Sequence, residues 1–405
     1  MRGNSVRRLL VFTICCVGIV SSPASTHGQA HASLQSLTPL KSQLPFQSPS
    51  RPQAPTRGTP STPSTNARTS RTDARRWLPT PTLVHTIVGP DGDELLTPSS
   101  IVALNNGQLA LFDFGAMELR AFATDGRQLW RTGRKGSGPG EFRNAMDLKV
   151  LPNGELQVLD MGSRRVTTVS STGKLVRTIP VRFSSSRFIP LADTTLVGLT
   201  ADDSGAFWSA VNRRGDVVQR GVAPPSIANH SSLTKEMFTT RLGAGAAVAF
   251  RWSDKIAILN ASGGVARILD GVEPLPFPAI KSYPMKVGKF TGQVSRIDPK
   301  AVPGALSIAS SGQQIFVLFA GATANRGHII DVYDARTGGY VGSQLLPNAA
   351  QELVVLADGS LATLRAEPIP SVDVWKVPSA KVGTHPANRA SRSALQKSVA
   401  KAREQ

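Results

Sequence analysis

The stretch from Gly133 to Phe142 combines glycines with cations in a way that could bind a ligand. It reads GRKGSGPGEF, with Arg134 and Lys135 next to the first glycine. Backbone amides of such a loop can hold a phosphate when a helix follows them. A dinucleotide loop also needs the spacing Gly-x-Gly-x-x-Gly after a strand. Here the glycines of GSGPG alternate with other residues and a strand-like run, LKVL, follows, so the sequence argues against a nucleotide site.

Cations of a second loop are expected on the same face as this stretch. Arg164 and Arg165 follow a predicted strand that points toward that face, as Arg134 and Lys135 do. These side chains could form a shallow anion-binding patch, and a solvated cationic rim is the alternative. The glutamate of the first loop lies where the loop meets the next strand. The candidate binding residues are therefore Arg134, Lys135, Glu141, Arg143, Arg164 and Arg165, with Arg131 as a further cation nearby.

Two aspartates lie at equivalent places, each at the end of a predicted strand. Asp113 and Asp160 are 47 residues apart. Carboxylates repeated in this way could form a ring around a channel. An aspartate at a strand end also commonly accepts hydrogen bonds from backbone amides of a nearby turn. The sequence favours this second, structural interpretation, and it does so for Glu94 and Glu141 as well.

Residues for zinc or triad chemistry are not grouped in the sequence. It contains no His-Glu-x-x-His and no Gly-x-Ser-x-Gly motif. Both cysteines, Cys15 and Cys16, lie in the N-terminal apolar run, so the mature chain is expected to have no thiol and no disulfide. The histidines expected to remain are dispersed along the chain: His85, His230, His328 and His385.

A repeat organises the first third of the folded part. Residues 83–129 align with residues 130–176 at a shift of 47 residues without a gap. The glycines, the Asn-Gly pairs and the aspartates coincide in this alignment. A repeat of this length indicates supersecondary units that stack on one another. The matching positions are Gly89 with Gly136, Asn106-Gly107 with Asn153-Gly154, Asp113 with Asp160, and Gly126 with Gly173.

Each repeat unit is predicted to contain four short antiparallel strands. Apolar residues alternate between the turns, and the Asn-Gly pairs predict two-residue type I′ hairpins. Less regular units follow at residues 187–219, 247–269, 306–346 and 351–377, and the last has only three strands. The isolated strand at 83–87 can supply its fourth. The sequence therefore predicts an all-β, six-bladed β-propeller of four-stranded antiparallel blades, closed by this N-terminal strand.

The chain resembles the bacterial six-bladed β-propeller proteins related to NHL-repeat proteins. Three runs carry the resemblance: GSGPGEF at 136–142, LPNGELQVLDMGSRRV at 151–166 and STGKLVRTI at 171–179. It is specific over residues 83–180 and architectural from there to about 378. Members of this group include exported proteins without an assigned activity. Relatives on the same architecture include calcium-dependent lactonases and esterases, an amidating lyase, and scaffold domains that bind proteins or RNA. A calcium site of the lactonase kind would draw on Glu141, Asn144 and Asp147, although the preceding unit lacks a matching set.

The ends of the chain differ in composition from its middle. Residues 1–32 are predicted to be a signal peptide, with three arginines, an apolar run and a small-x-small cleavage site, and an uncleaved membrane anchor is the alternative. Residues 33–77 are predicted to be a disordered spacer rich in Pro, Ser, Thr and Arg, residues 78–378 the propeller, and residues 379–405 a basic flexible tail. The net charge of +19 comes mostly from these ends.

These features favour a non-catalytic function. We expect an exported monomer, periplasmic or extracellular, that binds a protein or small-molecule ligand through loops on one face. The basic ends lack aromatic residues for base stacking, so no specific nucleic acid is expected, and weak contact with anionic membrane or wall surfaces is more plausible. No cofactor is expected. The alternative function is a calcium-assisted hydrolase or lyase with its site at the central channel, for which calcium would be the metal.

Overall fold

The computed structural model describes residues 75–104, 107–181, 187–191, 195–198, 206–212, 214, 216–222, 224–287, 290–321 and 326–378. The chain divides into two units, residues 1–73 and 74–405, and the described residues all belong to the second. The predicted signal peptide, most of the predicted spacer and the predicted tail therefore lie outside the described residues. Among those that are described, no helix has the length and apolar character needed to cross a membrane.

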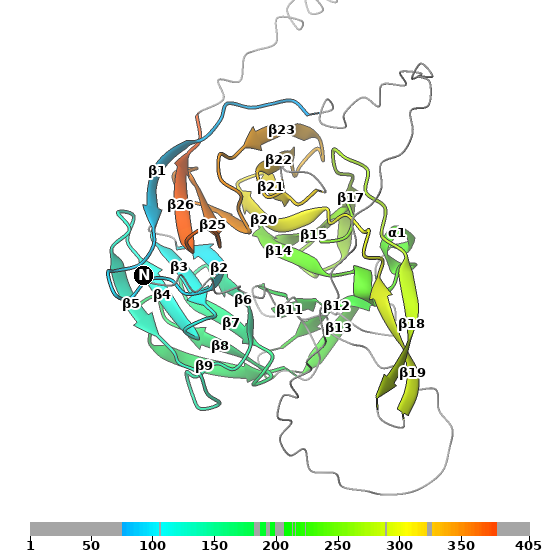
Figure 1. The fold of residues 1–405 in the computed structure, drawn as a ribbon, viewed down its shortest axis with the longest axis horizontal. Coiled ribbons are helices and arrows are strands. Elements are labelled where there is room, and N and C mark those ends of the chain that lie inside the picture. The colour runs from blue at the N-terminus through cyan, green and yellow to red at the C-terminus, as the bar shows by residue number, and fades with distance from the viewer. Residues whose placement is uncertain are drawn as a thin grey trace, which may run out of the picture. The chain divides into compact units, whose positions relative to one another are not determined.

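The described strands form four-stranded antiparallel sheets in which consecutive strands pair (Figure 1). The structure is thus an all-β propeller with four-stranded antiparallel blades, as predicted. The sheets consist of β2 (Pro98–Ala103), β3 (Leu109–Asp113), β4 (Glu118–Phe122) and β5 (Gln128–Thr132); β6 (Ala145–Val150), β7 (Leu156–Asp160), β8 (Arg165–Val169) and β9 (Leu175–Pro180); β10 (Phe188–Pro190), β11 (Thr195–Gly198), β12 (Ala206–Val211) and β13 (Val217–Val222); β14 (Met237–Leu242), β15 (Gly245–Phe250), β16 (Ile256–Leu259) and β17 (Val265–Leu269); and β20 (Ala305–Ser311), β21 (Gln314–Phe319), β22 (Ile329–Asp334) and β23 (Tyr340–Leu345).

The remaining four-stranded sheet joins the two ends of the described chain. It contains β24 (Glu352–Val355), β25 (Leu361–Arg365) and β26 (Ser371–Lys376), and its fourth strand is β1 (Thr82–Ile87). Leu83 pairs with Trp375 and Ile87 with Val372. Figure 1 shows β1, in blue, beside β26, in orange. β1 is therefore an edge strand of this sheet.

The hairpin turns differ from the predicted type. Gly154 has a φ of 81°, but Asn153 is not among the residues with positive φ, as a type I′ turn would require. The Gly154 N–H instead donates to the Leu151 carbonyl at 2.9 Å, and the Leu151 N–H donates to Glu155 at 2.7 Å. This is a type I turn followed by a left-handed glycine. The turns at Ala123–Arg127 and Ser170–Lys174 have the same pair of hydrogen bonds and a left-handed glycine, so this longer hairpin loop recurs in the blades, with or without a proline.

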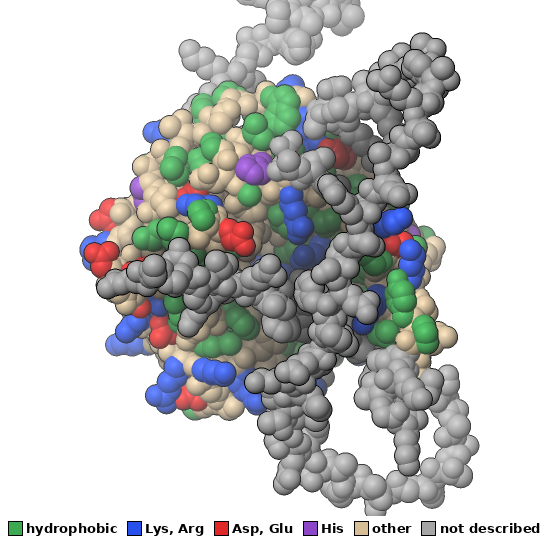
Figure 2. Space-filling model, viewed as in Figure 1, with side chains coloured by type: hydrophobic (Ala, Val, Ile, Leu, Met, Phe, Trp, Pro, Cys, Tyr) green, Lys and Arg blue, Asp and Glu red, His purple; other side chains and the backbone are tan. Residues whose placement is uncertain are grey.

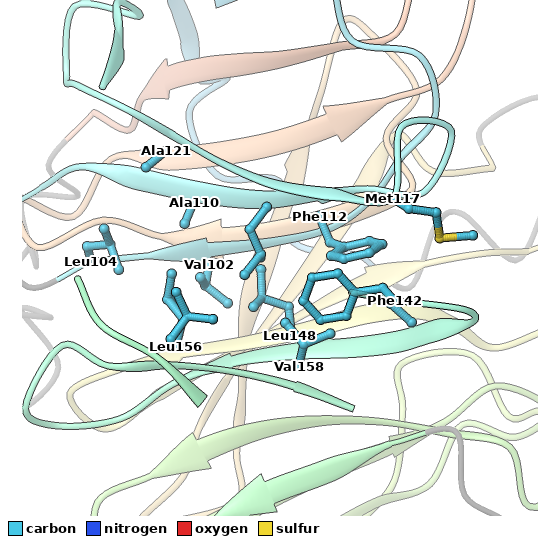
Figure 3. Packing of buried hydrophobic residues seen from close by; sticks show 13 residues of the cluster. Val102, Leu104, Ala110, Phe112, Met117, Ala121, Phe142, Leu148, Leu156 and Val158 are labelled. Carbon is cyan, nitrogen blue, oxygen red and sulfur yellow. The ribbon is translucent and has the colours of Figure 1, made fainter. Parts of the chain in front are cut away.

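Apolar side chains from neighbouring blades interdigitate to form the core (Figure 3). Phe142 comes directly after the glycine-rich stretch and is buried between the first two complete blades. Its ring meets that of Phe112 edge to face at 5.1 Å between centroids. Leu95, its counterpart one repeat earlier, is buried against residues of β25 and β26 such as Leu364. Both residues belong to the core, and each packs between successive blades.

The predicted boundary of the spacer is wrong by three residues. Arg75 is buried, and its guanidinium donates to both carboxylate oxygens of Asp331 at 3.0 Å. It also pairs with Glu273 and lies over the ring of Phe319, 4.5 Å from its centroid. Trp77 forms a parallel bridge with Ser343 on β23. The composition of residues 33–77 concealed this contact, because a single arginine that finds a buried carboxylate does not alter the polar character of the segment.

Three described elements were not predicted. A hairpin of β18 (Ile280–Val287) and β19 (Phe290–Ile297) forms a two-stranded sheet of its own between the blade strands β17 and β20, and Figure 1 shows it projecting from the ring. A short helix, α1 (Pro225–Ala228), and a 3-10 turn, η2 (Ser232–Thr234), precede β14. The visible surface carries Lys and Arg side chains at separate places with acidic side chains among them (Figure 2).

Candidate functional site

The glycine-rich loop is held together by its own charged side chains. The Glu141 carboxylate accepts hydrogen bonds from the Gly138 N–H at 2.7 Å and from Arg134 Nε at 2.7 Å. The hydrogen bond from Gly138 and then that from Arg134 lower the pKa of Glu141 below its usual range. A Cβ at Gly136 would lie only 2.1 Å from Glu141 Oε2. Glycine is therefore needed here to let the carboxylate fold back into its own loop.

Arg165 joins this loop to the neighbouring one. Its guanidinium donates to the carbonyls of Gly138 and Glu141, both at 2.7 Å, and to that of Ser137 at 3.2 Å. The guanidinium thus satisfies carbonyl groups that a glycine-rich turn would otherwise leave to water. Arg165, Glu141 and Arg134 lie close together, and their side chains bind one another or the loop backbone. Their first role is to shape the loop.

The other three candidate residues are exposed around this framework. Lys135 forms a parallel bridge with Phe142, the residue before Arg143. Gly162, two residues before Arg164, lies so close to Arg143 that an added Cβ would be 2.5 Å from the Arg143 Cβ. Within the described part of the chain, no ion pair is recorded for the side chains of these three cations. We call Lys135, Arg143 and Arg164 the cationic loop cluster.

The repeated aspartates are structural, as the sequence favoured. The fully buried Asp160 accepts hydrogen bonds from the backbone N–H groups of Arg143, Asn144 and Gly162 at 2.9 to 3.0 Å. Asp113 binds the corresponding amides one repeat earlier. Each carboxylate therefore fixes the start of the innermost strand of its blade. Because these acids are occupied inside their loops, they do not form a ring around the channel.

Arg131 lies outside the cationic loop cluster. It donates to both carboxylate oxygens of Asp93 at 3.0 Å. Glu94, the counterpart of Glu141, accepts a hydrogen bond from the Gly92 N–H at 3.0 Å, in the same way that Glu141 binds Gly138. The two glutamates therefore have equivalent structural roles in consecutive loops.

A cavity of about 220 Å³ lies where the innermost strands of the blades converge. Its walls come from β2, β6, β10, β14, β20 and β24, the innermost strand of each four-stranded sheet. We call it the channel cavity. The wall is apolar at positions such as Ile101, Leu148 and Leu353, and charged groups interrupt it. The polar and charged residues of the lining are Asp147, Lys149, Arg187, Thr239, Thr240, Arg241, Ser307, Ser310 and Glu352.

Both carboxylate oxygens of Asp147 accept hydrogen bonds from other protein groups. Its Oδ1 accepts from the Leu148 N–H at 3.1 Å and from Lys149 Nζ at 2.9 Å, and its Oδ2 accepts from the Phe188 N–H at 3.1 Å. The last bond crosses to the next blade. Arg187 is the residue before Phe188, so it lies next to this contact between blades. Its guanidinium donates to the Met146 carbonyl at 2.8 Å and lies 5.0 Å from the ring centroid of Phe238.

Glu352 is the most perturbed acid in the channel cavity. Burial raises its pKa to about 7, although Lys149 and Arg187 act in the opposite direction and Asp147 adds to the rise. A hydrogen bond from the Ile101 backbone also favours the ionised form. Because burial outweighs both cations, this side chain exchanges its proton near neutral pH. Perturbed acids in clefts are frequent at functional sites.

The predicted calcium ligands do not fit a calcium site. Ca²⁺ takes six to eight oxygen ligands, with carboxylates prominent among them. Glu141 is bound to Arg134 and Gly138 in the loop, whereas the Asp147 carboxylate contacts the Lys149 ammonium in the channel. Across the described residues, no group of three or more His, Cys, Asp or Glu is arranged to hold a metal ion.

Sequence reasoning missed the charged groups of the channel cavity. Lys149 and Asp147 are two residues apart in a predicted innermost strand, and therefore share one face of it. Glu352 begins the innermost strand of the last unit. A charged residue within the predicted innermost strand of a unit was therefore a signal in the sequence that could have identified these groups. The position of Arg187 has no comparable signal, because the units lose their regular spacing in that part of the chain.

Comparison with known proteins identifies the class of fold. No protein-family model and no curated protein matches the chain. Solved β-propeller structures do match. One is a protein of Bacteroides fragilis inferred to be exported, with 12% identity, a TM-score of 0.50, and coverage of 74% of this chain and 95% of that one. Another is a DUF4221 family member from Bacteroides vulgatus, with 9% identity, a TM-score of 0.52, and coverage of 74% and 98%.

A third similar structure has a catalytic function of its own. It is virginiamycin B lyase from Staphylococcus aureus in a catalytically inactive form with quinupristin, with 9% identity, a TM-score of 0.44, and coverage of 72% of this chain and 99% of that one. That TM-score supports no inference about this chain. The first two likenesses, at such low identity, establish the propeller fold alone.

Proposed function

We propose that the protein is an exported six-bladed β-propeller, related to NHL-repeat proteins, that binds an anionic partner of the cell envelope without catalysing a reaction. Six described four-stranded sheets and the pairing of β1 with β26 support the blade number and the closure. The signal-like residues 1–32 support export. The binding face is the one that carries the cationic loop cluster.

The cationic loop cluster carries this proposal. Its three cations are exposed, while the acids nearest to them in sequence, Glu141 and Asp160, bind groups inside the loops. The loop backbone is fixed by Arg165 and Asp160, so little ordering entropy is lost when a partner binds. A rigid surface with a local excess of positive charge favours an acidic partner and accelerates its association.

A charge-reversal experiment tests the proposal. The loop variant replaces Lys135, Arg143 and Arg164 by Glu. The matched control variant replaces three exposed cations of hairpin turns at the opposite ends of the blades, Arg127→Glu, Lys174→Glu and Arg214→Glu. Wild-type and control protein should retain the same envelope components in a pull-down, and the loop variant should lose them. Equal retention by all three proteins, or no retention by any, would overturn the proposal.

The competing function is a hydrolase or lyase with its site in the channel cavity. Glu352 is the observation that favours it, since an acid with a pKa of about 7 can act as a general acid or base. A lactone and ester panel tests this function. Turnover by the wild type that Glu352→Gln abolishes, at unchanged folding, would establish catalysis. Turnover that survives in Glu352→Gln would exclude this site.

A further inference from the structure

The proposed binding face leaves the charged groups of the channel cavity without a function. Lys149, Arg187 and Glu352 all line this one cavity, and both cations act on the ionisation of Glu352. They come from different places: β6, the residue before β10, and β24. Charges gathered from separate blades in one enclosed space are costly unless they are paired or bind something.

The two cations are held in fixed positions. The Arg187 guanidinium lies over Phe238 and is fixed by its hydrogen bond to the Met146 carbonyl. The Lys149 ammonium is held by Asp147 at 2.9 Å. An arginine stacked on an aromatic ring is already ordered, and its planar fork matches the two oxygens of a carboxylate or the oxygens of a phosphate. The cavity thus presents preorganised donors.

The two acids differ in how their oxygens are used. Both oxygens of Asp147 are bound to protein groups, and one of these bonds holds the neighbouring blade. Asp147 therefore serves the framework. The Glu352 carboxyl accepts a hydrogen bond from the Ile101 backbone. When it is protonated, Glu352 can donate a hydrogen bond to an acceptor in the cavity.

We propose that the channel cavity binds a small oxyanion, a carboxylate or a phosphate, between Arg187 and Lys149, with protonated Glu352 donating a hydrogen bond to it. This site is separate from the cationic loop cluster, and it needs no metal. The volume of about 220 Å³ suits a small ligand, since one water takes about 30 Å³ in the liquid. Apolar wall residues such as Ile101 and Leu353 would contact its carbon atoms.

Binding is coupled to the proton on Glu352. The charged groups around it are Asp147 and Lys149 from β6, Arg187 before β10, and Arg241 from β14; the described lining from β2 and β20 adds no charge. A bound anion next to an ionised Glu352 would be repelled. Since Glu352 is half protonated near pH 7, an anion that requires the protonated form binds about tenfold more weakly at pH 8 than at pH 6.

Isothermal titration of the purified protein tests this site. Acetate, succinate and inorganic phosphate are the probes, and succinamide is an uncharged control for succinate. We expect binding of at least one anion at pH 6, about tenfold weaker binding at pH 8, and no binding of succinamide. Succinate or acetate binding identifies a carboxylate site, and preference for phosphate identifies a phosphate site. Failure of every anion to bind overturns the proposal, as does binding that is unchanged by pH.

Three variants assign the binding to the named residues. Arg187→Gln should weaken binding by at least about tenfold, because a charge-assisted hydrogen bond is lost. Arg127→Gln, on an exposed hairpin, should leave it unchanged. Glu352→Gln should bind without the dependence on pH, and this result remains informative if Arg187→Gln fails to fold. Unaltered affinity in folded Arg187→Gln, or an unaltered pH dependence in Glu352→Gln, would contradict the assignment.

Discussion

Replacing Glu352 by Gln should make the stability of the propeller less sensitive to pH. The pKa of Glu352 is raised from 4.5 in an unfolded chain to about 7 in the fold, so the folded state binds the extra proton between these values. As the pH rises, the unfolded state therefore releases this proton at a lower pH than the folded state does. The contribution of this group to stability is therefore fully present below about pH 4.5 and is lost as pH rises through 7.

The magnitude follows from the size of the pKa rise. Each tenfold change in proton affinity corresponds to about 1.4 kcal/mol, so a rise from 4.5 to about 7 gives a full loss of at most about 3 to 4 kcal/mol of unfolding free energy. Partial contact of Glu352 with solvent in the cavity reduces this value. Gln keeps the shape of the side chain and can still accept the Ile101 hydrogen bond, but it never becomes charged. Glu352→Gln should therefore be more stable than the wild type at pH 8 and nearly equal to it at pH 4.5.

Urea unfolding at pH 4.5 and pH 8 measures the effect. At each pH, the unfolding free energy of the wild type is subtracted from that of the variant, because the contributions of the other titrating groups are the same in both proteins and cancel. Asp91→Asn, at an exposed turn, is the matched control and should change stability equally at both pH values. If Glu352→Gln shifts stability by the same amount at pH 4.5 and pH 8, the argument that burial dominates the ionisation of Glu352 is refuted.

Three further changes probe the contacts that hold the blades and loops. Arg75→Met should cost about 3–5 kcal/mol of unfolding free energy because it leaves Asp331 buried without its partner, and adding Asp331→Asn should recover part of the loss in urea unfolding. Asp160→Ala should cost at least about 2 kcal/mol because backbone amides lose their acceptor, with faster amide hydrogen exchange at residues 143–144 than in the wild type. Phe142→Ala should cost about 3–5 kcal/mol in the same unfolding assay, and a cost below 1 kcal/mol would show that the blades do not depend on this contact.

The propeller could be predicted because its blades repeat in the sequence. The buried aspartate at the end of the second strand and the glycines of the loops recur at a fixed shift, and the fold places them at equivalent positions. Alternation of apolar residues then identified most of the strands. The β18–β19 hairpin was missed because it has no counterpart in other units, although its sequence alternates around Gly288 as a hairpin does.

The charged site could not be predicted to the same extent, because it is assembled from distant parts of the chain. Glu352 and Lys149 are about 200 residues apart, and no spacing rule relates them. Arg134 and Glu141, by contrast, are close in sequence, so they were correctly grouped as loop residues. Their contact with each other was not predicted, because the same sequence is compatible with solvent-exposed charges and with charges that pair inside the loop.

The innermost strands show how a structural contact and a binding site can share one position. Asp147 accepts a hydrogen bond from the backbone of Phe188, Ser307 accepts one from Leu353, and Glu352 accepts one from Ile101, each time on the next blade. A polar residue at this place is thus explained by blade packing alone, and a carboxylate in the channel is no evidence of catalysis by itself. In the fifth blade the uncharged Ser307 makes this contact between blades. The structural role therefore does not account for an acid in the sixth blade, whereas the proposed oxyanion site gives a use both to Glu352 and to the cations Lys149 and Arg187 of the same cavity.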